Sequence, residues 1–79
     1  MTEVKILINS IDKVKNFVNI LSKFKDIEFD VVSGRYVVNA KSAMGLFSLD
    51  ITVPMDLQIM TEDEDVVEDV KEAIEDFLI

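Results

Sequence analysis

Residues 41–51 read KSAMGLFSLDI, and this short segment limits the fold of the whole chain. Its Ala, Met and Leu residues favour a helix, but only about two turns fit between Ser42 and Asp50. Pro54 follows soon after and stops any longer helix. A ferredoxin-like split βαβ fold needs a second helix that crosses the sheet, so the shortness of this segment disfavours that architecture.

Upstream of this segment, the pattern predicts a strand and then a helix. Alternating apolar residues predict a strand over residues 3–8. Asn9 and Ser10 come next, and both are good N-cap residues because a side-chain oxygen can accept a free amide of the first turn. An amphipathic helix ending near Lys25 is predicted by apolar residues at steps of three or four: Ile11, Val14, Phe17, Val18, Leu21 and Phe24.

Two further strands are predicted around a tight turn. Residues 27–31 alternate apolar with acidic side chains, and residues 35–40 return with two β-branched valines. The pair Ser33-Gly34 between them is a hairpin signal, because Gly tolerates the positive φ that such a turn demands. We expect Arg35 to lie on the surface and Tyr36 in the core.

Downstream of Pro54, the pattern predicts a last strand over Met55–Met60 and a last helix. Thr61-Glu62-Asp63-Glu64 has the spacing of a capping box. The apolar stripe of this helix consists of Val66, Val70, Ala73, Ile74 and Phe77. The order β-α-β-β-α-β-α predicts one α+β domain over residues 1–79, an antiparallel sheet with helices on one face.

Composition excludes several kinds of site. Hydrophobic residues make up 49% of the 79 residues, enough for a core and too many for a disordered chain. The chain has no Cys, which excludes disulfides and thiolate metal sites and favours a reducing cytoplasmic location. It also has no His, which excludes imidazole as a metal ligand, a general base or a phosphoryl acceptor. We therefore expect no cofactor and no metal.

The charge of −8 is concentrated at one end of the chain. Nine of the sixteen acidic residues and only one base, Lys71, lie in residues 62–79, so residues 1–61 are neutral in sum. Such an acidic surface argues against nucleic acid and against anionic membranes as partners. The run Glu62–Asp65 lacks the Gly and the alternating ligands of an EF-hand loop, so we interpret it as a solvated helix face. The first residues lack the features of a signal peptide, and no run of about 18 apolar residues predicts a membrane span.

The element order, the hairpin and above all residues 41–49, KSAMGLFSL, resemble HPr, the histidine-containing phosphocarrier of the sugar phosphotransferase system. HPr proteins of Gram-positive type carry a Lys-Ser-Ile-Met-Gly-Val-Met-Ser-Leu-Gly stretch at this place. The resemblance implies the HPr-like open-faced β-sandwich, in which a four-stranded antiparallel sheet of order 1-4-2-3 carries three helices on one face.

The likeness breaks where HPr has its active site. The family's Gly-hydrophobic-His-Ala-Arg-Pro signature matches Ile8-Asn9-Ser10-Ile11-Asp12-Lys13, so Ser10 stands in place of the histidine. Phosphohistidine transfer by the family mechanism therefore has no acceptor in this chain. A phosphoester on Ser10 would hold the phosphoryl group rather than pass it on, and we interpret Ser10 as a helix N-cap.

The resemblance assigns a different role to Ser42. In Gram-positive HPr the matching serine is phosphorylated by an ATP-dependent kinase as a regulatory signal, and Lys41 adds a cation beside it. Ser42 also suits an N-cap, and both roles are compatible. Asp50, in place of a family glycine, adds an anion nearby. In the family, exposed apolar residues of this helix contact partner proteins, so Met44 and Phe47 are either a docking patch or part of the core.

Two functions stay open. The first is a non-catalytic HPr-like protein with a regulatory or adaptor role in carbon catabolite control, whose partners by resemblance are HPr kinase or a transcriptional regulator. The second is a protein-interaction module with this fold and no link to sugar transport. An enzyme is disfavoured because the chain lacks His, Cys and a glycine-rich phosphate loop. The sequence does not decide the oligomeric state.

Overall fold

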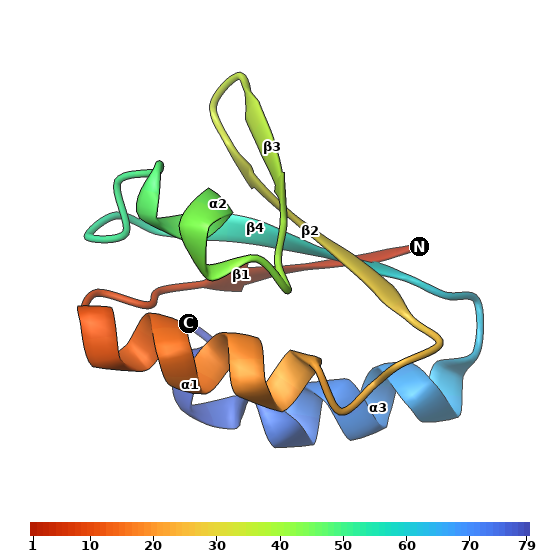
Figure 1. The fold of residues 1–79 in the computed structure, drawn as a ribbon. Coiled ribbons are helices and arrows are strands. Elements are labelled where there is room, and N and C mark those ends of the chain that lie inside the picture. The colour runs from red at the N-terminus through yellow and green to blue at the C-terminus, as the bar shows by residue number, and fades with distance from the viewer.

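Four antiparallel strands form a single sheet in the order β1-β4-β2-β3 (Figure 1). The computed structural model describes all of residues 1–79. The strands are β1 (Thr2–Ile6), β2 (Glu28–Ser33), β3 (Tyr36–Asn39) and β4 (Met55–Met60). This order confirms the arrangement implied by the resemblance, and the long β1 to β2 connection is what lets β4 enter between those two strands.

Three helices and one 3-10 turn complete the chain. They are α1 (Ile11–Leu21), α2 (Ala43–Phe47), α3 (Glu64–Ala73) and the turn η1 (Glu75–Phe77). Figure 1 shows α1 and α3 on the same side of the sheet, while the short α2 packs against α1 and β3. None of these helices combines the length and the apolar character needed to cross a bilayer.

One hydrophobic core joins the helices to one face of the sheet. Alternate residues of β4 and β2 point into it, and so does Leu46 of α2. The rings of Phe17 and Phe77 meet edge to face with centroids 5.1 Å apart, which ties α1 to the C-terminal turn. The fully or almost fully buried side chains of the strands are Ile6, Phe29, Val31, Met55, Leu57 and Ile59. The opposite face of the sheet stays open to solvent, as the predicted alternation requires.

The β2–β3 hairpin confirms a tight turn here, but the loop is one residue later than the predicted Ser33-Gly34, because Ser33 is still paired as the last residue of β2. Ser33 pairs with Tyr36, so only Gly34 and Arg35 form the loop. Gly34 has φ of +60°, and Arg35 does not share the positive φ, as in a type II′ turn. The position that requires positive φ is therefore held by the one residue that adopts it without steric cost.

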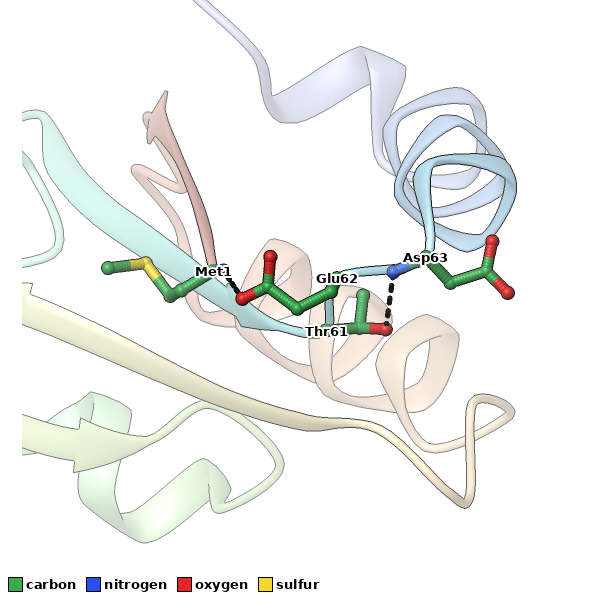
Figure 2. A network of polar contacts seen from close by, with 4 residues as sticks. All are labelled: Met1, Thr61, Glu62 and Asp63. Carbon is green, nitrogen blue, oxygen red and sulfur yellow. Dashed lines mark hydrogen bonds and ion pairs between the residues drawn. The ribbon is translucent and has the colours of Figure 1, made fainter.

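Two expectations about helix ends were wrong. The first helix ends at Leu21 rather than near Lys25, because the amides of Lys23 and Phe24 bond three residues back and tighten the chain. The last helix begins at Glu64 with Asp63 as its N-cap, so Thr61 is not the N-cap residue and no capping box forms with Glu64. Thr61 instead accepts a hydrogen bond from the Asp63 amide at 3.1 Å (Figure 2). The carboxylate of Asp63 accepts from the amides of Asp65 and Val66, which makes it the stronger cap.

Two residues expected in the core are exposed. Ile11 is 61% exposed, because it is the first residue of α1 and the helix meets the core only from Val14 onward. Tyr36 is 69% exposed, since it lies at the turn end of the outermost strand. Both positions follow the predicted periodicity, but neither has an element covering it.

Candidate functional site

Ser10 is the N-cap of α1. Its hydroxyl oxygen accepts the backbone amide of Lys13 at 3.2 Å, as the cap interpretation predicted. Asn9, just before it, has φ of +70°, a region that Asn tolerates better than most residues. The Asn9 amide donates to the carbonyl of Ile51 at 2.8 Å. The loop before α1 is thus held against the loop after α2.

The surroundings of Ser10 give its hydroxyl no chemical activation. A serine nucleophile needs an adjacent base, and the only hydrogen-bond partner of this oxygen is a backbone amide. Asp12 lies two residues on and places an anion, not a cation, in the first turn. An N-terminal turn that contains an acid is stabilised by the helix dipole, which accounts for Asp12 structurally.

Ser42 is the N-cap of α2, and its hydroxyl accepts the amide of Gly45 at 3.1 Å. Gly45 is closely surrounded: a Cβ there would lie 3.3 Å from Cβ of Val38 and 3.4 Å from Oγ of Ser42, so these neighbours would have to shift by a few tenths of an ångström. The glycine therefore lets α2 approach β3 closely and keeps its amide next to the Ser42 hydroxyl. Ser42 itself is half-buried.

The side chain and the backbone amide of Lys41 both bond to other parts of the same chain. Its ammonium donates to the carbonyl of Phe24 at 2.8 Å and lies 5.6 Å from the ring centroid of Phe29. Its backbone amide donates to the side chain of Asn39 at 2.8 Å. These bonds tie the end of β3 to the chain that follows α1, and they define where α2 starts.

Helix α2 presents Met44 and Phe47 to solvent. Met44 is 85% exposed and Phe47 is 44% exposed, whereas Leu46 between them is fully buried. Residues three apart lie on one side of a helix, so the two exposed side chains form one apolar surface, called the α2 surface below. Leu46 anchors the helix by its opposite side.

Ile11 and Val53 are two further exposed apolar residues near this end of the molecule. Each lies two residues from one end of the Asn9–Ile51 hydrogen bond, so both belong to the joined loops beside α2. The sequence pattern did not predict that these two residues lie on the surface. The periodicity assigned Ile11 to the core stripe, and nothing in the sequence says that the loops meet.

Asp50 closes a local turn after α2. Its carboxylate accepts from the Thr52 hydroxyl at 2.6 Å and from the Thr52 amide at 3.0 Å. These bonds favour the ionised form and hold the pKa of Asp50 below its usual value, with the hydroxyl bond as the larger cause. A fixed negative charge therefore stands at the C-terminal side of α2.

The acidic end of the chain forms a separate, shallow hollow. Its volume is about 430 Å³, and it lies between the first residues and the start of α3. The terminal amine of Met1 contacts Glu62 at 2.7 Å (Figure 2), and this hydrogen bond and charge lower the pKa of Glu62. No group of three or more acidic side chains here or elsewhere in residues 1–79 is arranged to hold a metal ion.

Comparison with known proteins places the chain in a family. Residues 13–78 match the family model of the PTS HPr component phosphorylation site. The chain belongs to the HPr family. The matched HPr segment starts at Lys13, three residues after Ser10, and no curated protein matches the chain.

Two crystal structures of HPr proteins share the fold. HPr-C-His from Thermoanaerobacter tengcongensis is 31% identical, with a TM-score of 0.77 over 96% of this chain and 89% of that one. The phosphocarrier protein HPr from Bacillus anthracis strain Ames is 20% identical, with a TM-score of 0.69 over 91% of this chain and 94% of that one. The present HPr-family chain contains no histidine.

Proposed function

We propose that this chain is a non-catalytic, regulatory or adaptor member of the HPr family that is phosphorylated on Ser42. The observation that carries the proposal is the combination of a complete absence of histidine with an intact Ser42 cap on α2. The phosphotransferase reaction needs an imidazole nitrogen that accepts a phosphoryl group and releases it again. A serine ester does not release it readily, so a phosphate on this chain acts as a signal rather than as cargo.

The geometry at Ser42 supports a phosphate at that position. The hydroxyl already faces the first-turn amide of Gly45, and free amides at a helix start favour a negative group. In the reaction the Ser42 oxygen bonds to the γ-phosphorus of ATP, its proton passes to a base of the kinase, and ADP leaves. A capping hydroxyl is thereby replaced by a capping phosphate.

The α2 surface supports a protein partner next to this position. Met44 and Phe47 are exposed on the same helix that Ser42 caps, so a phosphate there would lie beside the apolar contact. Met is adaptable and Phe provides a large apolar area, which suits a protein surface better than a small ligand. By family resemblance we propose HPr kinase or a transcriptional regulator as the partner. The proposal includes a cytoplasmic location and no cofactor, metal or enzymatic activity.

The test is intact-mass measurement after two incubations, each with an authentic HPr as positive control. One contains phosphoenolpyruvate and the first enzyme of the phosphotransferase system, and the other contains ATP and HPr kinase. We expect one added phosphate only with the kinase, lost in Ser42→Ala and retained in Ser48→Ala. Ser48 is a matched control because it caps the other end of the same helix.

The alternative, an interaction module with no link to sugar transport, also rests on the α2 surface. It predicts no phosphate in either incubation and partner binding that is equal in wild type and Ser42→Ala. A phosphate gained from phosphoenolpyruvate would contradict both functions, because it would require an acceptor other than histidine.

A further inference from the structure

The two outer strands of the sheet, β1 and β3, differ in what lies beside them. The C-terminal residues cover the Lys5–Ile6 end of the β1 edge: Ile6 bridges to Leu78, and the amide of Ile79 donates to the Lys5 carbonyl at 3.3 Å. The edge of β3 has no strand beside it. An open edge presents unpaired amides and carbonyls, and it is a template for pairing with another chain.

The register identifies which groups of β3 point outward. Ser33 pairs with Tyr36 around the two-residue turn, and the Ala40 amide bonds back to the Phe29 carbonyl at 2.9 Å. Even-numbered residues therefore direct their backbone groups to β2, so Val37 and Asn39 direct theirs to the open edge. The Asn39 carbonyl already accepts the Ser42 amide, while no turn or loop hydrogen bond uses the amide or carbonyl of Val37.

Strand β3 is short, but it lacks two other devices that protect a sheet edge against association. Its sequence is Tyr-Val-Val-Asn, which contains no charge and no proline. The side chains of Tyr36 and Val37 are 69% and 60% exposed on opposite faces of the strand. An incoming strand would therefore gain backbone bonds at Val37 and apolar contacts on both sides.

We propose that two copies of this chain associate through β3, antiparallel and centred on Val37. In this register each Val37 exchanges both backbone hydrogen bonds with Val37 of the second copy. Tyr36 then lies opposite Val38 of the second copy and covers that half-buried valine. The two four-stranded sheets become one continuous sheet of eight strands related by a two-fold axis.

Charge complementarity favours a second copy as the occupant. Arg35 at the turn and Asp30 on the open face belong to none of the three ion pairs within the chain. In the proposed register Arg35 lies opposite Asn39 of the second copy, and Asn39 is paired across the hairpin with Asp30. The long Arg35 side chain thus faces Asp30 of the second copy, and symmetry creates the pair twice.

The position of β3 also reduces repulsion between two chains of charge −8. Residues 62–79, which contain α3, account for this net charge, and Figure 1 shows α3 at the opposite side of the molecule from the β2–β3 turn. Charges separated by more than about 8 Å at physiological salt are largely screened. Pairing through β3 therefore keeps the two acidic helices apart, whereas pairing through the helical face would bring them together.

The test is sedimentation velocity of the full chain from low micromolar to near-millimolar concentration. A four-residue edge gives a small interface, so we expect a weak, concentration-dependent dimer. Val37→Lys should abolish it without unfolding the chain, because that side chain is exposed. Met44→Lys, an equal change on the α2 surface, should leave it intact.

Charge exchange tests the register. Arg35→Asp and Asp30→Arg should each weaken the dimer roughly tenfold, since each changes two symmetric pairs. The double variant Asp30→Arg with Arg35→Asp should restore it. Hydrogen exchange at the Val37 amide should slow as the concentration rises. A monomer throughout, a dimer lost only in Met44→Lys, a failed rescue, or a monomer that instead captures an extended peptide on β3 would overturn the proposal.

Discussion

At Ser42 one hydroxyl closes the first turn of α2 and is also the proposed phosphate acceptor. The helix has only five residues, so it depends on its cap and on Leu46 more than on its own propensity. Ser10 caps α1 by the same kind of bond, but α1 has eleven residues and three fully buried anchors. Equal caps therefore have unequal consequences: a change at Ser42 alters the surface that carries Met44 and Phe47.

The pKa of Asp50 provides a test of the electrostatics next to α2. We expect its carboxyl to titrate below the usual 3.8, because the Thr52 hydroxyl and amide bond to the ionised form. Thr52→Val should raise the pKa of Asp50 only part of the way, since the amide bond remains. Carbon-detected NMR titration measures both values.

The lowered pKa of Asp50 also predicts how the stability of the protein changes with pH. A pKa that is lower in the folded than in the unfolded chain adds stability above about pH 3.8, and this stability is lost as the pH falls through the folded value. Thr52→Val should therefore reduce the acid sensitivity contributed by Asp50. A Thr52→Val protein with an unchanged Asp50 pKa would contradict the assigned cause.

Among the elements, the β2–β3 hairpin has the most demanding backbone. The turn depends on Gly34 at positive φ, and the space around a Cβ at this position is empty. Gly45 is the opposite case, because its φ is ordinary and a Cβ there would be tight against Val38. One glycine thus serves conformation and the other serves packing.

Gly34→Ala should destabilise the protein by about 1 kcal/mol, because an L-residue is strained at this φ while no clash accompanies it. Gly34→Asn should cost less, since Asn tolerates the left-handed region. Urea unfolding gives both free energies. Equal stabilities of the Ala and Asn variants would show that φ at this turn does not limit the fold.

At the scale of the whole molecule, the charge is as uneven as the sequence predicted. The acids of α3 point to solvent along one side, and only one of them, Glu68, has a basic side chain, that of Lys71, within ion-pair distance. Two acids in the first turn of α3 are stabilised by the helix dipole, but the later ones mainly repel one another. Self-repulsion of this kind lowers the stability of a compact state.

Raising the salt concentration from low to physiological should therefore raise the melting temperature by a few degrees, because screening relieves this repulsion. The double variant Asp69→Asn with Glu72→Gln removes two exposed charges and should show a smaller salt effect. Differential scanning calorimetry on dilute samples keeps self-association out of the measurement. A melting temperature that falls with salt would mean that the exposed ion pairs outweigh the repulsion.

The sequence by itself determined the element order, the turn at Gly34, the shortness of α2 and the caps at Ser10 and Ser42. These features depend on neighbours within a few residues, so local periodicity and capping chemistry encode them. The strand order 1-4-2-3 followed from the family resemblance and not from the pattern. The absence of histidine, which shapes the functional proposal, is also a property of the sequence alone.

The tertiary structure alone decided which apolar residues face solvent. It buried Leu46 and exposed Met44, left Ile11 beyond the edge of the core, and turned the Lys41 ammonium inward to Phe24. It also covered the Lys5–Ile6 end of the β1 edge with the C-terminal residues and left β3 without a strand on its outer side. Periodicity states which side of an element is apolar, but only the packing of distant segments determines whether anything covers that side.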